Sequence, residues 1–242
     1  MTYTTNTQLY QDPALVEGED YGRRYRRQEL FDDDLAGRGG VVRTTILALH
    51  GGGIETGTSE LCLAVAGYHP ATLEVTPPGG VTHDYWMFEG LRGRDNDALH
   101  VTSTGCNDRV ARSLCAGSLN ALSLHGFRPQ SVGLPADEQL TLVGGCNQTL
   151  KGHLLEALAE ADLCARDAAP FPDLNGNHPR NIANRTLLRA GGHLELTTPL
   201  RLAMFEVNTR EDRKHTTTPV FWAFVAACRA ALARLEAEQV VL

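Results

Sequence analysis

The sequence lacks the features that would place it at once in several large classes of protein. No stretch approaches the ~18 consecutive apolar residues that a membrane-spanning helix needs. Its six cysteines include no CxxC pair, which argues against a zinc finger and against a disulfide framework. Internal repeats and low-complexity segments are also absent. For a globular chain of 242 residues with this composition we expect one α/β domain rather than two.

Lysine is scarce as well. Lys151 and Lys214 are the only lysines among 22 basic residues, and the formal net charge is −7. This charge argues against nucleic acid or an anionic membrane as the main partner. Residues 1–12 are polar and lack the apolar core of a signal peptide. We therefore expect a cytoplasmic protein, while association with a phage or export by a non-standard route stays open.

Segments with strand and helix patterns alternate along the chain, as in a layered α/β domain. The patterns predict strands at 44–49, 71–76, 84–89, 98–102, 120–124, 141–143 and 193–197. They predict helices at 58–68, 107–117, 148–162 and 219–238, with a helical turn at 181–188. The polar residues 1–40 are expected to form an N-terminal extension, with one or two short elements, that packs on a main domain of residues 41–242.

The most informative segment runs from Leu47 to Glu55. An apolar run ends in His50, continues through three glycines and reaches Glu55. Such a turn can aim an imidazole and a carboxylate at one point beyond the carboxyl end of a strand, where open α/β sheets keep their sites. A metal site, an oxyanion loop and a phosphate-binding loop all fit this segment.

Two of these sites need partners that the sequence does not provide. The HGGG oxyanion loop of lipase-like hydrolases requires a GxSxG nucleophile motif, and the nearest candidate, residues 101–105, lacks the first glycine. A phosphate-binding P-loop requires a lysine, and none lies near residues 51–59. The metal site is therefore the favoured interpretation.

His125 repeats the pattern of His50, because it also ends a short apolar run and precedes a glycine. Two histidines and Glu55 form the ligand set of many catalytic zinc sites, which leave a fourth position for water. His100 is a rival for the third ligand. The alternative is that His50 and His125 are structural histidines held by hydrogen bonds.

The strand at 193–197 carries a third element of the site. Alternation places Leu194 and Leu196 on one face, with His193 and Glu195 on the other. A carboxylate in a buried strand is costly unless it is paired or functional. Beside a metal-bound water, Glu195 could act as the general base. The alternative is an ion pair between Glu195 and an arginine, either Arg201 or Arg185.

Several of these motifs occur in one order that resembles a known family. The segments that carry the resemblance are 50–60, 99–104, 123–126, 143–147, 181–185, 194–196 and Arg201. Together they resemble the phage-type poly-γ-glutamate hydrolases, whose fold is similar to that of the zinc carboxypeptidases. The resemblance implies a single three-layer α/β domain, with a central mixed β-sheet flanked by helices and one zinc at its edge.

The resemblance also implies roles for individual residues. It assigns one Zn²⁺ per chain to His50, Glu55 and His125, makes Glu195 the catalytic carboxylate and leaves His100 a role in the pocket or in the structure. The implied reaction is hydrolysis of γ-glutamyl amide bonds in poly-γ-glutamate.

Binding an acidic substrate calls for further side chains. Guanidinium groups pair well with carboxylates and can stabilise an oxyanion. We expect Arg201 to act on the oxyanion. Residues expected to bind the substrate are Arg185, Asn184, Arg109, His100 and His193.

The chain departs from the family in ways that leave the substrate open. Residues 105–109 replace an aromatic and acidic segment, His193 stands where the family commonly has glutamine, and residues 128–139 resemble an insertion. The substrate is expected to be an acidic γ-glutamyl polymer or a small N-acyl amino acid. The alternatives are a carboxypeptidase-like or N-acyl amino-acid amidohydrolase, and a non-catalytic binding protein that retains the fold.

Overall fold

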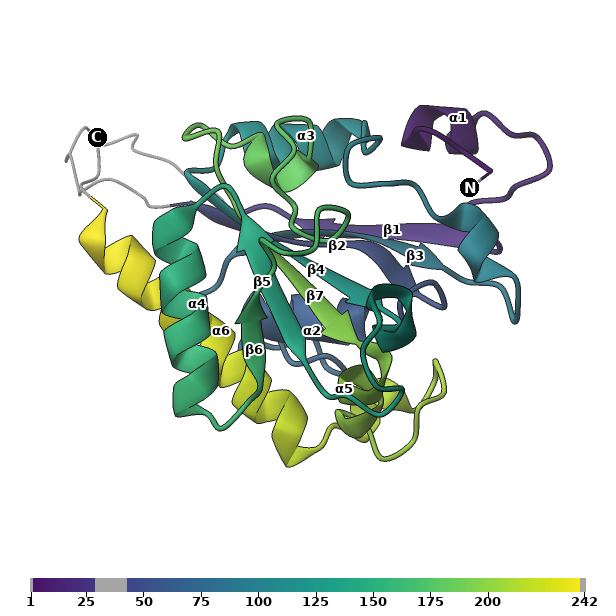
Figure 1. Cartoon of the computed structure of the whole chain (residues 1–242). Coiled ribbons are helices and arrows are strands. Elements are labelled where there is room, and N and C mark those ends of the chain that lie inside the picture. Colours follow the sequence, from purple (N-terminus) through teal and green to yellow (C-terminus); the bar gives the residue numbers. More distant parts are fainter. Residues whose placement is uncertain (1, 29–42, 240–242) are drawn as a thin grey trace.

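A computed structural model describes residues 2–28 and 43–239, and one seven-stranded sheet forms its centre (Figure 1). The strands lie in the order β1 (Tyr21–Arg26), β3 (Asp84–Gly90), β2 (Thr44–Gly52), β4 (Asn120–Phe127), β7 (Gly192–Thr197), β5 (Thr141–Gly145) and β6 (Ala165–Asp167). Strands β3, β2, β4 and β7 are parallel, whereas β1 and β5 run antiparallel to their inner neighbours. The predicted mixed sheet is confirmed.

Helices cover both faces of this sheet and complete the three layers (Figure 1). The α-helices are α1 (Asn6–Tyr10), α2 (Thr58–Val65), α3 (Arg109–Ala116), α4 (Gln148–Glu160), α5 (Thr198–Ala203) and α6 (Pro219–Glu238). Short 3₁₀ helices are η1 (Asn96–Leu99), η2 (Pro129–Val132), η3 (Ile182–Asn184) and η4 (Arg213–His215). Over residues 2–28 and 43–239, no helix has the length and apolar character needed to cross a bilayer.

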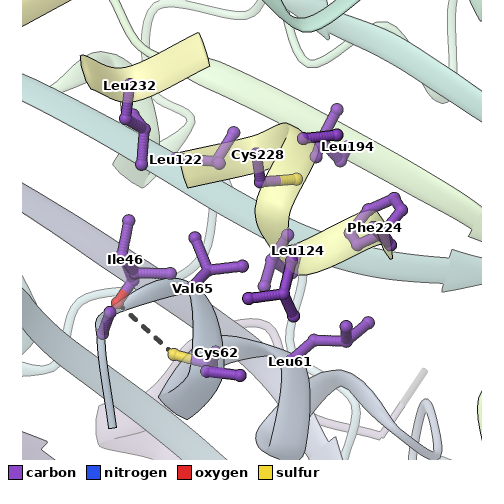
Figure 2. Close-up of a cluster of buried hydrophobic side chains, with 14 of the residues drawn as sticks. Ile46, Leu61, Cys62, Val65, Leu122, Leu124, Leu194, Phe224, Cys228 and Leu232 are labelled. Atoms are coloured by element: carbon purple, nitrogen blue, oxygen red, sulfur yellow. Dashed lines mark hydrogen bonds between the residues drawn. The ribbon is translucent and has the colours of Figure 1, made fainter. Parts of the chain in front are cut away.

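The larger core lies between one face of the sheet and helices α2, α4 and α6. Alternate residues of β4 and β7, Leu122, Leu124, Leu194 and Leu196, face these helices and are fully buried. Figure 2 shows the apolar side chains meeting there, with the Cys62 thiol pointing to the Ile46 carbonyl oxygen. Hydrophobic burial on this scale is the main force that holds the layers together.

A second core covers part of the opposite face. It joins the other side of β2 and β3 to α1, α3 and η3. Its largest fully buried members include Trp86, Phe88 and Leu47. Because β2 is buried on both faces, its sequence is a continuous apolar run rather than an alternating one.

Some predicted elements differ from the structure. Residues 71–76 form no strand, because Leu73 adopts a left-handed φ of 61° and only an isolated bridge joins Val75 to Tyr68. The predicted strand 98–102 is also wrong: η1 ends at Leu99, and the Val101 carbonyl accepts from a side chain instead of a neighbouring strand. Strand β6 and helix α5 were not predicted.

The N-terminal segment is more closely joined to the sheet than its polar composition suggests. Strand β1 pairs with β3 over its whole length and forms the edge of the main sheet. The Tyr21 ring of β1 stacks on the Phe88 ring of β3, with ring centroids 5.4 Å apart, which supports this position. The predicted boundary at residue 40 lies outside the described residues.

Candidate metal and catalytic site

The parallel strands β2, β4 and β7 end at the same edge of the sheet and bring their terminal residues together. His50 lies near the end of β2, His125 near the end of β4 and Glu195 in β7. His125 and Glu195 are paired across the β4–β7 ladder. This edge is where open α/β sheets bind ligands.

The glycine-rich segment after His50 turns sharply and returns Glu55 to the strand end. Gly52 has a left-handed φ of 64°, and a Cβ there would collide with the Gly90 carbonyl oxygen. The Glu55 amide donates to the His50 carbonyl at 2.7 Å, and the Gly53 amide donates to Gly90 at 2.9 Å. Glycine is needed here because the backbones approach too closely for a side chain.

Two buried arginines hold this turn in place by donating to its backbone carbonyl groups. The Arg213 guanidinium donates to the Gly52 carbonyl at 3.3 Å and forms an ion pair with Glu60 at 3.2 Å. Arg201 Nη1 donates to the Thr56 carbonyl at 2.8 Å. The backbone on both sides of Glu55 is therefore held by charge-assisted hydrogen bonds.

His50, Glu55 and His125 point their polar atoms at one another. His50 Nδ1 lies 2.9 Å from Glu55 Oε1 and 3.2 Å from His125 Nδ1. His125 Nδ1 lies 3.7 Å from Glu55 Oε2, which also accepts from the Gly126 amide at 2.9 Å. A tetrahedral zinc ion with bonds of about 2.1 Å would place its ligand atoms about 3.4 Å apart, so the observed spacing fits such an ion.

Hydrogen bonding shows why this cluster favours a cation. The Val101 carbonyl can only accept, so His50 Nε2, at 2.7 Å from it, carries the hydrogen. In the neutral ring, Nδ1 is then a bare lone pair facing a carboxylate oxygen and a second imidazole nitrogen. Such atoms repel unless a proton or a metal ion lies between them, so the donor set fits a metal.

The electrostatics of the cluster agree with this arrangement. Burial opposes the charged form of His50, but Glu55 outweighs it and raises the pKa of the imidazole. Burial would raise the pKa of Glu55, but His50, His100 and His125 together hold it well below its usual range. Burial and the neighbouring His193 lower the pKa of His125 strongly. His125 is thus neutral, the form that binds metal.

His100 meets the same carboxylate from another side. Its ring stacks on that of His50 with centroids 3.8 Å apart, and its Nε2 lies 3.7 Å from Glu55 Oε1. The ligand atoms of His50, Glu55 and His100 lie within 4.8 Å of one another. His50 and Glu55 therefore have two neighbouring imidazoles, those of His100 and His125, that could complete a metal site.

Glu195 forms the other half of the site with His193. His193 Nε2 lies 3.0 Å from Glu195 Oε1, and the His193 ring stacks on His125 with centroids 4.4 Å apart. Both residues are buried. Burial raises the pKa of Glu195, and the hydrogen bond from His193 opposes that rise. A raised carboxyl pKa is typical of catalytic acids and bases.

These side chains line a cavity of about 460 Å³. The rest of its wall is formed by the segments 102–104 and 172–178, together with Gly126 and Asn181. No motif places segment 172–178 at the site, although its Pro and Asn content is typical of a loop. Phe171 and Leu174 pack against a small core with Phe127 and Leu142, which holds this loop at the site.

Comparison with known proteins agrees with the motifs and the geometry. A family model described as poly-gamma-glutamate hydrolase matches residues 26–227. The chain belongs to this family. It is therefore a hydrolase, and the predicted resemblance is confirmed.

Two solved structures share the fold of this poly-γ-glutamate hydrolase family member. A bacteriophage poly-gamma-glutamate hydrolase is 26% identical, with a TM-score of 0.79 over 98% of this chain and 99% of that one. The zinc-free apo form of YndL is also 26% identical, with a TM-score of 0.73 over 97% of this chain and 98% of that one.

Among curated relatives, the SPbeta prophage-derived protein YoqZ of Bacillus subtilis is 31% identical over 76% of this chain. The match spans 60% of the length of YoqZ. YndL of the same organism is 28% identical over 80% of this chain and 70% of its own length.

The described lining of the cavity includes none of the other residues predicted for this hydrolase, although the Arg201 guanidinium packs against Gly126 in the wall. Arg201 is buried, and its guanidinium donates to the Leu196 and Thr56 carbonyls, a geometry that indicates an anchor for the turn. Arg109 and Arg185 are exposed, and neither belongs to the described lining of the cavity. Their geometry gives no support to roles on the oxyanion or the substrate, which stay predictions.

Asn184 lies beneath the loop rather than in the cavity. Its amide nitrogen donates to the Gly176 carbonyl at 2.8 Å and the His178 carbonyl at 3.1 Å. Its oxygen accepts from the Gly191 amide at 3.0 Å. The side chain ties the loop to the start of β7, so it would influence a substrate only through the loop.

Proposed function

We propose that this chain hydrolyses γ-glutamyl amide bonds in poly-γ-glutamate with one zinc ion held by His50, Glu55 and His125. The observation that carries the proposal is the convergence of two imidazole nitrogens and a carboxylate, within 2.9–3.7 Å of one another, beside Glu195 in one cavity. This is the ligand set of a catalytic zinc site, with a second carboxylate free for proton transfer.

Two further facts support zinc and this choice of ligands. The relative YndL is known in a form described as zinc-free. His125 is more deeply buried than His100, whose side chain is 29% exposed, and its Nδ1 faces both of the other ligands. When bound, zinc would polarise the scissile carbonyl and lower the pKa of a water molecule towards neutrality.

Residues of the protein transfer the proton and hold the metal ligand in place. Glu195 accepts a proton from the attacking water and returns it to the leaving nitrogen, for which its raised pKa suits it. Gly126 and His100 hold the Glu55 carboxylate through a backbone amide and an imidazole. The loop 172–178 lines the cavity beside these groups.

The proposed substrate is the acidic γ-glutamyl polymer of the family name. The described wall of the cavity contains no arginine or lysine, so neutral groups such as the hydroxyls of Thr102, Ser103 and Thr104 would meet the substrate there. Hydroxyl groups can pair with both the carboxylates and the amide groups of such a chain.

Metal dependence tests the chemistry. Protein stripped with a chelator should lose hydrolysis of poly-γ-glutamate and regain it on addition of one equivalent of zinc. Poly-α-glutamate and N-acetylglutamate serve as comparison substrates. Full activity of the metal-free protein would overturn the mechanism, and cleavage of N-acetylglutamate alone would replace the polymer with a small substrate.

A pair of variants tests the ligand set. His125→Ala should abolish stoichiometric zinc in the purified protein, while the matched control His100→Ala should retain it. Metal analysis by mass spectrometry measures both. Zinc retained in His125→Ala and lost in His100→Ala would assign the third ligand to His100.

A further inference from the structure

His193 has its two ring nitrogens committed to protein groups, although it lines the cavity. Nε2 lies 3.0 Å from Glu195 Oε1, and Nδ1 lies 3.0 Å from Ser123 Oγ and 3.4 Å from Asn181 Nδ2. The side chain is buried. No polar atom of this ring is left to bind a substrate.

The surroundings determine which nitrogen carries the hydrogen. The Asn181 oxygen accepts from the Ala183 amide at 3.0 Å, and its nitrogen donates to the Gly176 carbonyl at 3.2 Å, so the orientation of this amide is settled. Its nitrogen can only donate, so His193 Nδ1 must accept. The hydrogen of the neutral ring is then on Nε2, which donates to Glu195.

The His193 ring is also held by close neighbours. One face stacks on His125 with an interplanar angle of 28°. The backbone of Gly176 also lies so close to this side chain that a Cβ there would collide with the imidazole. Gly176 has a left-handed φ of 65°, which suits glycine. The Nε2–H group therefore points in one fixed direction.

We propose that His193 is a positioning residue that orients Glu195 by donating a hydrogen bond to Oε1. This bond leaves Oε2 for the proton of the attacking water, since no hydrogen bond to Oε2 occurs within the described residues. Without the donor, the glutamate side chain can take other rotamers, and a small misplacement of a catalytic group is costly. The proposal rests on the proposed function and corrects the expected substrate-binding role of His193.

Two substitutions separate positioning from packing. His193→Gln places an amide N–H close to the position of Nε2, whereas His193→Leu fills similar space without a donor. His193→Leu should lower kcat about 10- to 100-fold, with KM within about twofold of the wild-type value. His193→Gln should keep most of the turnover that His193→Leu loses. Zinc content and Tm of both variants are measured alongside, with Glu195→Gln as the reference for a lost base.

The outcomes distinguish the proposals. Equal kcat in His193→Leu and the wild type, while Glu195→Gln is inactive, would overturn the positioning role alone. A raised KM with unchanged kcat would return His193 to substrate binding. Unchanged turnover in Glu195→Gln would overturn the proposed function itself.

A second measurement reports on the wild-type protein and does not depend on the activity of a variant. Nitrogen-15 NMR of histidine-labelled protein, with the His193 signal assigned by its loss in His193→Gln, reports the tautomer directly. Hydrogen on Nε2 is expected. Hydrogen on Nδ1 would show that His193 cannot donate to Glu195 and would overturn the proposal.

Discussion

The two faces of strands β4 and β7 are equally buried but chemically opposite. One face carries Leu122, Leu124, Leu194 and Leu196, packed against helices (Figure 2). The other carries Ser123, His125, His193 and Glu195, each with a polar partner. Neighbouring residues of one strand thus belong to a hydrocarbon core and to a polar cluster.

The difference between the two faces shows that one stabilises the fold and the other carries the candidate site. Burying hydrocarbon is favourable at about 25 cal/mol per Å². Burying ionisable groups costs free energy that pairing only partly offsets. The polar face therefore weakens the fold relative to an apolar one, which makes sense for a catalytic site.

The largest expected effect is on turnover after a change on the polar face. Glu195→Gln should lower kcat by about 10²–10⁴-fold, because general acid–base catalysis typically contributes that much. Initial rates on poly-γ-glutamate measure it, with zinc content as a control. A loss below tenfold would show that this face does not supply the base.

The same variant should gain stability at neutral pH. Burial raises the pKa of Glu195 above its ordinary value of 4.5, so the ionised side chain destabilises the folded state. The gain should shrink as the pH falls through the raised pKa and vanish below the ordinary one, where both states bind the proton. Thermal unfolding of zinc-free protein across pH measures it, and a lower Tm at neutral pH would contradict it.

A change on the apolar face should have the reverse pattern. Leu122→Ala should cost about 2–5 kcal/mol in the free energy of unfolding, because it leaves a cavity among fully buried side chains. Turnover per folded molecule should stay unchanged. Urea unfolding and rates at low temperature measure the two, with Leu122→Met as the volume-conserving control. A tenfold loss of kcat would break the division between the faces.

A smaller effect is expected where the loop meets the polar face. Asn184→Ala leaves the buried Gly191 amide without its acceptor and removes one of the two donors to the Gly176 carbonyl, so it should cost about 1–3 kcal/mol. Hydrogen exchange should rise over residues 172–178, and KM should rise more than kcat falls. Asn184→Asp, which keeps the acceptor oxygen but removes the donor, is the matched control. Unchanged exchange in the loop would contradict this role.

The smallest effect is expected for the exposed arginines. Arg109→Ala and Arg185→Ala should change KM by less than about twofold, because neither side chain lines the cavity and isolated surface charges contribute little. Short γ-glutamyl peptides and the full polymer should be compared. A tenfold rise in KM for the polymer alone would show that its chain extends to these residues.

The strands that hold the site were predictable because their patterns are strong. Residues 44–49, 120–124 and 193–197 all lie within observed strands, and the apolar or alternating run identified each one. The apolar residues of 71–76 led to a wrong strand prediction, because Leu73 and Val75 are exposed rather than inside a sheet. Strand β6 has only three residues and a polar edge position, so it left no pattern to detect.

Of the site, the residues at strand ends were predictable, and the arginines were not. His50, His125 and Glu195 follow from local pattern, and the structure brings them together at one edge. The expected roles of Arg201 and Asn184 depended on which backbone carbonyls lie nearby, and both side chains are committed to such groups. No local sequence pattern indicates which backbone carbonyl groups lie near a side chain in the folded protein.

The sequence by itself determined which side chains share a face, because alternation in a strand is a property of neighbouring residues. It placed His193 with Glu195, and His50 with Glu55 across three glycines. Only the tertiary structure decided that β7 lies beside β4, which sets His125 against Glu195. Strand order depends on contacts between residues far apart in the chain, and the direction of each imidazole depends on those contacts in turn.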